Sequence, residues 1–309
     1  MLNPMRSPLA ALAAFLALLA PPLHAQSQHL PTPQPTKQVP APEAVRPALW
    51  KVEQGKSVIY LFGTVHALPA GVPWLDGKIA DALDQSDTLV TEIIEKDPAA
   101  MRQIVMQTAM LPEGQTLRTK LTPKQRAAFE KALAANGLPA AGLDRFRPWY
   151  AAVALSTLPL LKSGYDPANG VDVTLAARAK DAHKVHEALE TPEYQLGLFN
   201  QLPEAAQKRY LNEVATGTNT ITQDLAKMIR EWKAGHAEKL AQLMNEDESD
   251  PALLKLLLID RNRNWAQWIK ARLDKPGIVL LAVGAGHLAG PGSVQQQLAR
   301  LGIKVTRVQ

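Results

Sequence analysis

The chain has 309 residues, of which 46% are hydrophobic, 34 are Lys or Arg and 29 are Asp or Glu, for a formal net charge of +5. This composition supports a substantial buried core and excludes an intrinsically disordered protein, and the absence of a basic block argues against nucleic-acid binding. Cysteine is absent, which excludes disulfides, thiolate metal ligands and cysteine nucleophiles.

The amino-terminal part of the chain is expected to be an export signal and a linker. Arg6 precedes an apolar run at 9–20, and a short segment with small residues ends at Ala25. This order is typical of a secretory signal peptide, so we expect cleavage after residues 1–25 and secretion across the inner membrane into the periplasm, with an uncleaved anchor as the alternative. Residues 26–47 are rich in proline and predict a semi-extended linker. No membrane span is expected after cleavage, because no later run approaches about 18 apolar residues.

A single folded domain is expected at 48–309, and it begins with a β-hairpin. Residues 49–52 and 58–62 read as short strands on either side of a turn. The second strand is apolar and rich in β-branched residues, which is typical of a strand buried on both faces. It ends in Gly63-Thr-Val-His66, so the glycine permits a sharp turn and the histidine follows at the end of the strand.

The next segment completes a first unit of strand, Gly-x-x-His, loop, helix and strand. A loop rich in proline and glycine leads to a predicted helix at 76–85 and a predicted strand at 88–94. Glu92 lies near the end of this apolar strand. An unpaired carboxylate there would be costly, so we expect Glu92 to have a partner or a function.

Residues 97–273 are predicted to form a large helical insert. One of its helices opens at 170–172, and a short strand is expected at 184–189. Glu190 follows that strand as Glu92 follows the earlier one. We consider it a candidate to hold the site residues in position without being a metal ligand itself. His183 and His186 have a spacing seen in metal sites, but we expect neither to be a ligand, because two such rings on a strand need not converge.

The end of the chain repeats the order of parts found at its beginning. A strand at 278–283 leads into Gly284-Ala-Gly-His287, and a helix at 293–301 and a strand at 304–308 follow. We therefore predict an α/β fold with a central mixed sheet, built from two pseudo-symmetric strand-Gly-x-x-His-helix-strand halves around the helical insert. Two such halves in one sheet would bring both strand ends to one edge, where open α/β sheets bind ligands.

His66, His287 and Glu92 are the candidate metal ligands at these strand ends. Two imidazoles and a carboxylate suit zinc, manganese, cobalt or iron, and an open coordination position would hold a water molecule. A divalent metal lowers the pKa of its bound water and polarises a substrate carbonyl, so such a site indicates a hydrolase. Glu92 would act as a ligand or as the base toward that water.

Each of these residues also has a structural interpretation. Each histidine could simply bond to the backbone at the end of its strand. Glu92 could form a buried ion pair with an arginine of 261–264, a segment on a helix that faces the core through Trp265 and Trp268. The two interpretations are compatible, because such an arginine could also bind a substrate carboxylate. A serine hydrolase is not indicated, since no Gly-x-Ser-x-Gly motif is present.

Several motifs, in order, resemble the TraB/GumN family, and in particular its GumN-type branch. These are Leu-Trp-Lys-Val at 49–52, Leu-Phe-Gly-Thr-Val-His at 61–66, Glu92, Leu-Glu-Thr-Pro-Glu-Tyr-Gln at 189–195, Asp-Arg-Asn-Arg-Asn-Trp at 260–265 and Val-Gly-Ala-Gly-His-Leu at 283–288. The resemblance implies a fold of the Tiki and erythromycin-esterase-like type. Tiki members are described as peptidases that use manganese or cobalt, and TraB-type members as acting on peptide pheromones. It also implies metal or catalytic roles for His66, Glu92 and His287, and a charged site role for Arg261.

The expected function is that of an exported metal-dependent hydrolase, acting on a peptide amide bond. Its partner would be a peptide or another small-molecule substrate, and the oligomeric state is left open. One alternative is a non-catalytic envelope protein that sequesters a peptide, iron or haem in the same cleft. Another is a scaffold with a vestigial site.

Overall fold

A computed structural model of the protein describes residues 45–245 and 250–309. The predicted signal peptide, most of the predicted linker and part of the acidic connection near 245–250 lie outside the described residues. Val45 and Pro47 are already buried, so the described fold begins slightly before residue 48. No helix in the described part of the chain has the length and apolar character needed to cross a membrane.

The centre of the molecule is a six-stranded mixed sheet in the order β4-β3-β5-β2-β1-β6. The strands are β1 (Leu49–Gln54), β2 (Ser57–Thr64), β3 (Thr88–Thr91), β4 (Val185–Ala188), β5 (Gly277–Gly284) and β6 (Thr306–Arg307). Strands β2, β5, β3 and β4 run parallel, whereas β1 is antiparallel to β2 and to β6. This arrangement confirms the predicted α/β class, the mixed sheet and the opening hairpin.

The register of the sheet brings the ends of three strands to one edge. Strands β2 and β5 are neighbours, with Thr64 opposite Gly284. On the other side of β5, Thr91 lies opposite Ala282, and Glu92 follows directly. Because parallel strands end at the same edge, both Gly-x-x-His segments and Glu92 leave the sheet side by side.

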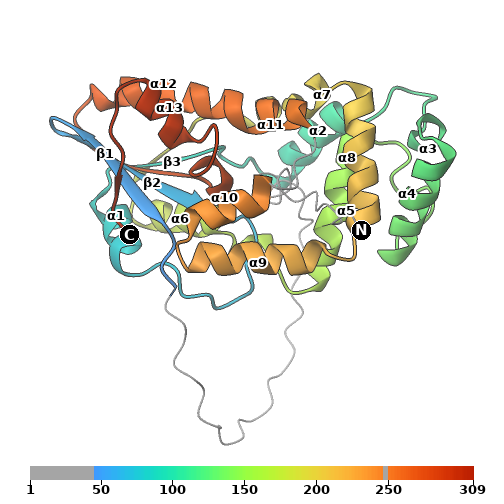
Figure 1. Ribbon diagram of the computed structural model, residues 1–309, viewed down its shortest axis with the longest axis horizontal. Helices are drawn as coiled ribbons and strands as arrows, with labels where there is room; N and C mark the ends of the chain where they lie inside the picture. Colours follow the sequence, from blue (N-terminus) through green and yellow to red (C-terminus); the bar gives the residue numbers. More distant parts are fainter. Residues whose placement is uncertain (1–44, 246–249) are drawn as a thin grey trace, which may run out of the picture.

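Helices surround this sheet and extend beyond it. They are α1 (Gly77–Gln85), α2 (Pro98–Ala109), α3 (Leu117–Lys120), α4 (Pro123–Ala135), α5 (Pro148–Lys162), α6 (Val171–Asp181), α7 (Pro192–Gln201), α8 (Glu204–Gly217), α9 (Ile221–Lys233), α10 (Ala237–Asn245), α11 (Pro251–Leu254), α12 (Asp260–Leu273) and α13 (Val294–Arg300). The described residues also include short helical turns, namely η2 (Pro167–Asn169), the π-helix η3 (Lys255–Ile259) and η4 (Ala285–His287). In Figure 1, α3, α4, α5 and α8 lie at the end away from the strands.

The two faces of the sheet are buried in separate hydrophobic clusters. Val279, Leu281 and Val283 of β5 pack with α12 and α13 on one face. Leu280 and Ala282 pack on the other face in a larger cluster that includes α1, α6 and α9. This two-sided burial explains why β5 reads as a continuous apolar run.

Two predicted strand boundaries, and the way the two halves join the sheet, differ from the structure. The strand predicted at 88–94 ends at Thr91, whose hydroxyl donates to the Ile93 carbonyl at 2.8 Å and turns the chain off the sheet. The strand predicted at 304–308 is only Thr306–Arg307, because β1 pairs with just these two residues. The two halves also end differently, since β3 joins β5 whereas β6 joins the edge strand β1. The helical insert contributes β4 to the sheet, as expected from the predicted strand at 184–189.

Candidate functional site

His66, Glu92 and His287 lie around the Cα atom of Gly284. A Cβ atom placed on Gly284 would lie 3.1 Å from Glu92 Oε1, 3.5 Å from His66 Nε2 and 3.6 Å from His287 Cδ2. His287 Nε2 is 3.9 Å from Glu92 Oε1, and all three side chains are buried. The structure thus brings the three residues singled out in the sequence to one point, and glycine at 284 keeps that point open.

His66 is oriented by Asp172 at the start of α6. Its Nδ1 hydrogen bonds to Asp172 Oδ2 at 2.8 Å. Helix α6 can approach this closely because Gly170 precedes it, where a Cβ atom would lie only 2.7 Å from the His66 carbonyl oxygen. Burial lowers the pKa of His66, but the Asp172 carboxylate and its hydrogen bond outweigh it and raise the pKa to about 9. Within the described residues, the buried Nε2 atom of His66 has no hydrogen-bond partner.

His287 is held in the opposite charge state. Its Nδ1 hydrogen bonds to Asn262 Oδ1 at 2.6 Å, and the Asn262 amide nitrogen donates to the Gly292 carbonyl at 2.9 Å. Nδ1 therefore carries the proton, and the Nε2 lone pair accepts from Arg261 Nη1 at 3.2 Å. Burial and the nearby guanidinium lower the pKa of His287 to about 3, so its ring is neutral near pH 7.

Glu92 is an ionised carboxylate with both oxygens occupied. Oε1 accepts from the Gly284 backbone N–H at 2.7 Å. Oε2 accepts from Arg261 Nη2 at 2.6 Å and from the Gln195 amide at 2.7 Å. Burial raises the pKa of Glu92, but Arg261 and the two histidines outweigh this and lower it to about 2. The carboxylate thus has the partners that its burial requires.

Arg261 joins Glu92 to a second carboxylate, Glu190. Its Nε donates to Glu190 Oε1 at 2.9 Å and its Nη2 to Oε2 at 2.8 Å. Trp265 Nε1 donates to the same Oε1 atom at 3.0 Å. The guanidinium is fully buried, and the two carboxylates raise its pKa although burial alone would lower it. The predicted ion pair between Glu92 and an arginine of this helix is confirmed. Glu190 accepts hydrogen bonds from the same guanidinium and so fixes its orientation.

The local backbone places the arginine. The π-helix η3 runs directly into α12 just before Arg261, and Arg261 Nη1 donates to the Leu257 carbonyl of η3 at 3.0 Å. Short π-helical turns are often found at functional sites.

A divalent metal matches the donor types and the charge of this cluster. Both histidines donate Nδ1 to a side-chain oxygen, as metal-binding histidines commonly do, which leaves each Nε2 atom near Glu92. With both rings neutral, the three carboxylates of Glu92, Glu190 and Asp172 and the one guanidinium sum to a charge of −2, which a divalent cation would neutralise.

Two observations show that the side chains would have to rearrange before they could bind a metal ion. Within residues 45–245 and 250–309, no group of three His, Asp or Glu side chains stands in an arrangement that could hold a metal ion. Arg261 also occupies the His287 lone pair. The residues therefore fit a metal in donor type, ring orientation and charge. To bind a metal, His66 Nε2 must lose its proton, and the Arg261 guanidinium must move away from His287 Nε2.

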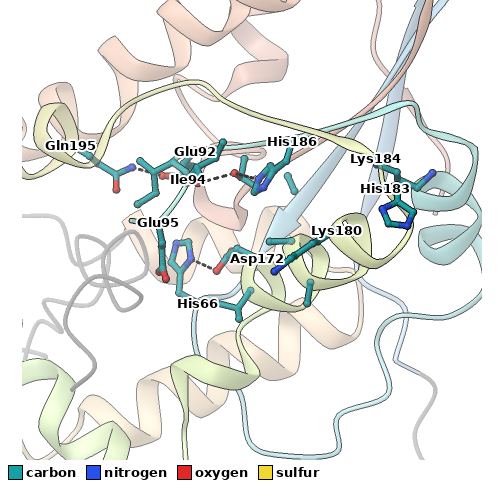
Figure 2. Close-up of a pocket in the computed structure, with 16 residues that line it drawn as sticks. His66, Glu92, Ile94, Glu95, Asp172, Lys180, His183, Lys184, His186 and Gln195 are labelled. Atoms are coloured by element: carbon teal, nitrogen blue, oxygen red, sulfur yellow. Dashed lines mark hydrogen bonds and ion pairs between the residues drawn. The ribbon is translucent and has the colours of Figure 1, made fainter. Parts of the chain in front are cut away.

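A cavity of about 600 Å³ opens beside the cluster. His66, Glu92, Asp172 and Gln195 line it at one end, as Figure 2 shows. His183 and His186, which were not expected to be ligands, line the same cavity. The Thr91 hydroxyl donates to Ile93, so the His186 ring must donate its Nε2 proton to that hydroxyl, at 2.9 Å.

The sequence did not reveal the residues that orient the two histidines. Asp172 was noted only as part of a helix start, and it lies 106 positions from His66 in the chain. Asn262 and Gln195 lay inside recognised motifs without an assigned role. An acidic residue in the first turn of a helix is a weak signal by itself, because such residues commonly only stabilise the helix.

Comparisons with known proteins test the resemblance to the TraB/GumN family. The model of the TraB/PrgY/gumN family matches residues 48–307. The protein YbaP of Escherichia coli K12, described as uncharacterized, is 26% identical over 257 residues, covering 82% of this chain and 92% of that protein. An uncharacterized protein of Treponema pallidum is 21% identical over 259 residues, which covers 79% of this chain and 78% of the Treponema protein. No solved structure matches the chain at a significant level. The match to the family model spans nearly the whole described fold, and the chain belongs to the TraB/PrgY/gumN family.

Proposed function

We propose that the protein is an exported hydrolase of peptide amide bonds that works in the periplasm with a divalent metal held by His66, Glu92 and His287. The observation that carries the proposal is the convergence of these side chains beside Gly284, at the end of a cavity lined by His66 and Glu92. A buried imidazole nitrogen without a partner, such as His66 Nε2, is costly unless a ligand satisfies it.

Each residue of the cluster has a distinct task under this proposal. The metal, when bound, would supply a water molecule of lowered pKa and polarise the substrate carbonyl. Asp172 fixes the His66 ring through Nδ1, and His66 has to release its Nε2 proton before that atom can act as a ligand. Glu92 is ionised, so its carboxylate would either hold the metal or, in place of that, accept a proton from the attacking water. Arg261 is fully buried, so it positions Glu92 and does not touch the substrate.

Metal content and peptide cleavage in three variants test the proposal. The protein is purified without chelators or a histidine tag, its metal is measured by mass spectrometry, and cleavage of a mixed peptide library is followed. We expect His66→Ala and His287→Ala to lose metal and to reduce cleavage at least about 100-fold, because each removes a ligand. His236→Ala should change neither, since the His236 side chain is 52% exposed and pairs with the carboxylate of Glu231, away from the site residues. Undiminished metal and activity in both site variants would overturn the proposal.

A binding protein is the second candidate, and one observation favours it. Both oxygens of Glu92 accept hydrogen bonds, and Arg261 donates to Glu92 and to Glu190 at the same time. Such a network also suits a rigid cleft that sequesters a peptide, iron or haem without chemistry. Ligand binding without turnover in a metal-loaded sample would favour this function over hydrolysis.

A further inference from the structure

The cavity beside the cluster continues along α6 to a basic end. Beyond His66 and Asp172 its wall becomes apolar, with Ile93, Val173, Ala176 and Ala177. Three basic side chains then complete the lining: Lys180, His183 and Lys184. Figure 2 shows these three on the opposite side of the cavity from Gln195 and Glu95. The cavity is therefore elongated, with carboxylates at one end, an apolar middle and basic groups at the other end.

The two lysines at the basic end differ in their availability. The Lys184 ammonium donates to the backbone carbonyls of Asp84 at 2.9 Å and Ser86 at 2.7 Å, so two of its three donors are used. Lys180 is exposed, and its ammonium has no hydrogen-bond or ion-pair partner within the part of the chain that the structure describes. In Figure 2 its side chain points back along α6 toward Asp172. Lys180 is thus a cation on the cavity wall that is available to a ligand.

His183 adds a second, independent observation at this end. Its backbone φ is +54°, and it is the one residue other than glycine with a positive φ in the described chain. It follows the end of α6, where glycine is the usual residue for this conformation. A residue held in a sparsely populated conformation on a cavity wall points to a use for its side chain.

We propose that Lys180, with His183 and Lys184 beside it, forms a subsite for the free carboxylate at the end of a short peptide. This inference rests on the proposed function and specifies its substrate. The carboxylates of Glu92 and Glu95 line the cavity on the side away from Lys180 and repel an anion there. The peptide therefore lies with its carboxylate at Lys180 and its scissile amide at the cluster around Gly284.

The length of α6 limits how many residues lie between these two points. Asp172 and Lys180 are eight residues apart in one helix, which places their Cα atoms about 12 Å apart at 1.5 Å per residue. An extended peptide covers about 3.3–3.6 Å per residue. At most about three residues therefore fit between the scissile amide and the carboxylate, and the apolar wall favours small apolar side chains on them.

Binding of matched peptides tests the subsite without requiring cleavage. The probes are fluorescein-labelled Ala-Leu-Ala-Ala with a free carboxyl terminus and the same peptide with a terminal amide. Their dissociation constants are measured by fluorescence anisotropy with the full mature chain carrying His66→Ala, and with His287→Ala as a second background in case the first does not fold. We expect the free acid to bind about tenfold more tightly than the amide, as for one charge-assisted hydrogen bond.

Substitution of Lys180 decides whether that difference belongs to the subsite. Lys180→Gln should bring the ratio of the two dissociation constants close to one, whereas Lys270→Gln, at an exposed position of α12 outside the cavity, should leave it unchanged. Equal binding of both peptides by the parent, or a ratio that survives Lys180→Gln, would overturn the inference. Absent cleavage by the wild-type protein, together with an intact ratio in the His66→Ala background, would reject the proposed hydrolysis alone. Normal cleavage by the wild-type protein, together with a ratio of one, would reject the subsite alone.

Discussion

The two Gly-x-x-His histidines have opposite charge states. The Asp172 carboxylate outweighs burial and raises the pKa of His66 to about 9. Burial and the Arg261 guanidinium lower the pKa of His287 to about 3, and its Nδ1 atom faces the neutral Asn262 amide. A positive ring and a neutral ring therefore face the same carboxylate, Glu92. This asymmetry makes His66 the donor whose proton must leave before a cation can bind.

Asp172→Asn tests the charge state of His66 in protein without added metal. The pKa of His66 is raised from 6.5 to about 9 on folding, so the stabilisation is complete below pH 6.5 and disappears as the pH rises through 9. We expect the variant to lose on the order of 3 kcal/mol in the free energy of unfolding at pH 6 and to lose the decline between pH 6.5 and 9. Urea unfolding at several pH values measures both.

Glu231→Gln is the matched control for this change. It removes the carboxylate beside His236, a histidine whose side chain is 52% exposed, so we expect a much smaller loss of stability than for Asp172→Asn, because solvent screens an exposed pair. An Asp172→Asn protein with the wild-type stability profile from pH 6 to 9 would contradict the assigned charge of His66.

Arg261→Met tests the buried ion network. The substitution leaves Glu92 and Glu190 buried without their cation, so we expect a loss of about 3–5 kcal/mol in the free energy of unfolding at pH 7. Arg263→Met, on the same helix, removes a cation that is 58% exposed and pairs with Asp260, and it should cost less than about 1 kcal/mol. Equal stability of the two variants by chemical denaturation would show that the network is not structural.

The sequence predicted the residues that protrude from strand ends and missed those that hold them. His66, His287 and Glu92 follow apolar strands, and a strand end can be read from its own residues. Asp172 acts on His66 only because α6 docks against the loop after β2. That contact joins segments far apart in the chain, and no local pattern encodes it.

At the scale of elements, the site depends on how closely α6 approaches the loop that carries His66. The Val171 backbone N–H donates to the Val65 carbonyl at 3.0 Å, and Gly170 lies against His66 with no room for a side chain. The first turn of α6 thereby presents the Asp172 carboxylate to the His66 ring.

Gly170→Ala tests this docking. Its Cβ atom would lie 2.7 Å from the His66 carbonyl oxygen and 2.8 Å from that of Pro167, and both are backbone atoms that cannot move easily. We expect a loss of about 1–3 kcal/mol in thermal or chemical unfolding and weaker metal binding. Gly197→Ala in α7 is the control, because nothing lies within 4 Å of its Cβ position and alanine favours a helix by up to about 1 kcal/mol. A Gly170→Ala protein as stable as wild type would contradict the close packing.

Elements buried on both faces were the most predictable from sequence. Strands β2 and β5 agree with their apolar runs, and β1 pairs with β2 across the predicted turn. The predicted strand was longer than β3 because Ile93 and Ile94 are apolar and prolong the apolar run in the sequence. In the structure both residues lie beyond the sheet. The π-helix η3 has no sequence signal comparable to a glycine or a proline, so the helix before Arg261 was predicted only as helix.

At the scale of the whole molecule, the sheet joins two distant parts of the chain, and the helical insert supplies Asp172, Gln195 and Arg261 to the point where they meet. The fold class was predictable because the two terminal units repeat one order of parts. The way the insert wraps back onto the site was not, because it depends on packing among many helices.

Export of the protein gives a prediction for the intact molecule. The apolar run at 9–20 and Ala25 predict cleavage that leaves Gln26 as the first residue. Intact-mass measurement of protein isolated from a periplasmic extract should give that mass. Retention of residues 1–25, or recovery only from the cytoplasm, would contradict the proposed location.

The convergence of three donors on Gly284 is the central claim, and titration of Gly284→Ala with manganese tests it most directly. The added Cβ atom would fill the space between Glu92 Oε1 and His66 Nε2, at 3.1 Å and 3.5 Å, while the backbone φ of −48° at this position suits alanine. Calorimetry should show one manganese ion bound by wild type and by Gly197→Ala, and at least about tenfold weaker binding by a folded Gly284→Ala protein. Equal manganese binding by Gly284→Ala and wild type would contradict the account.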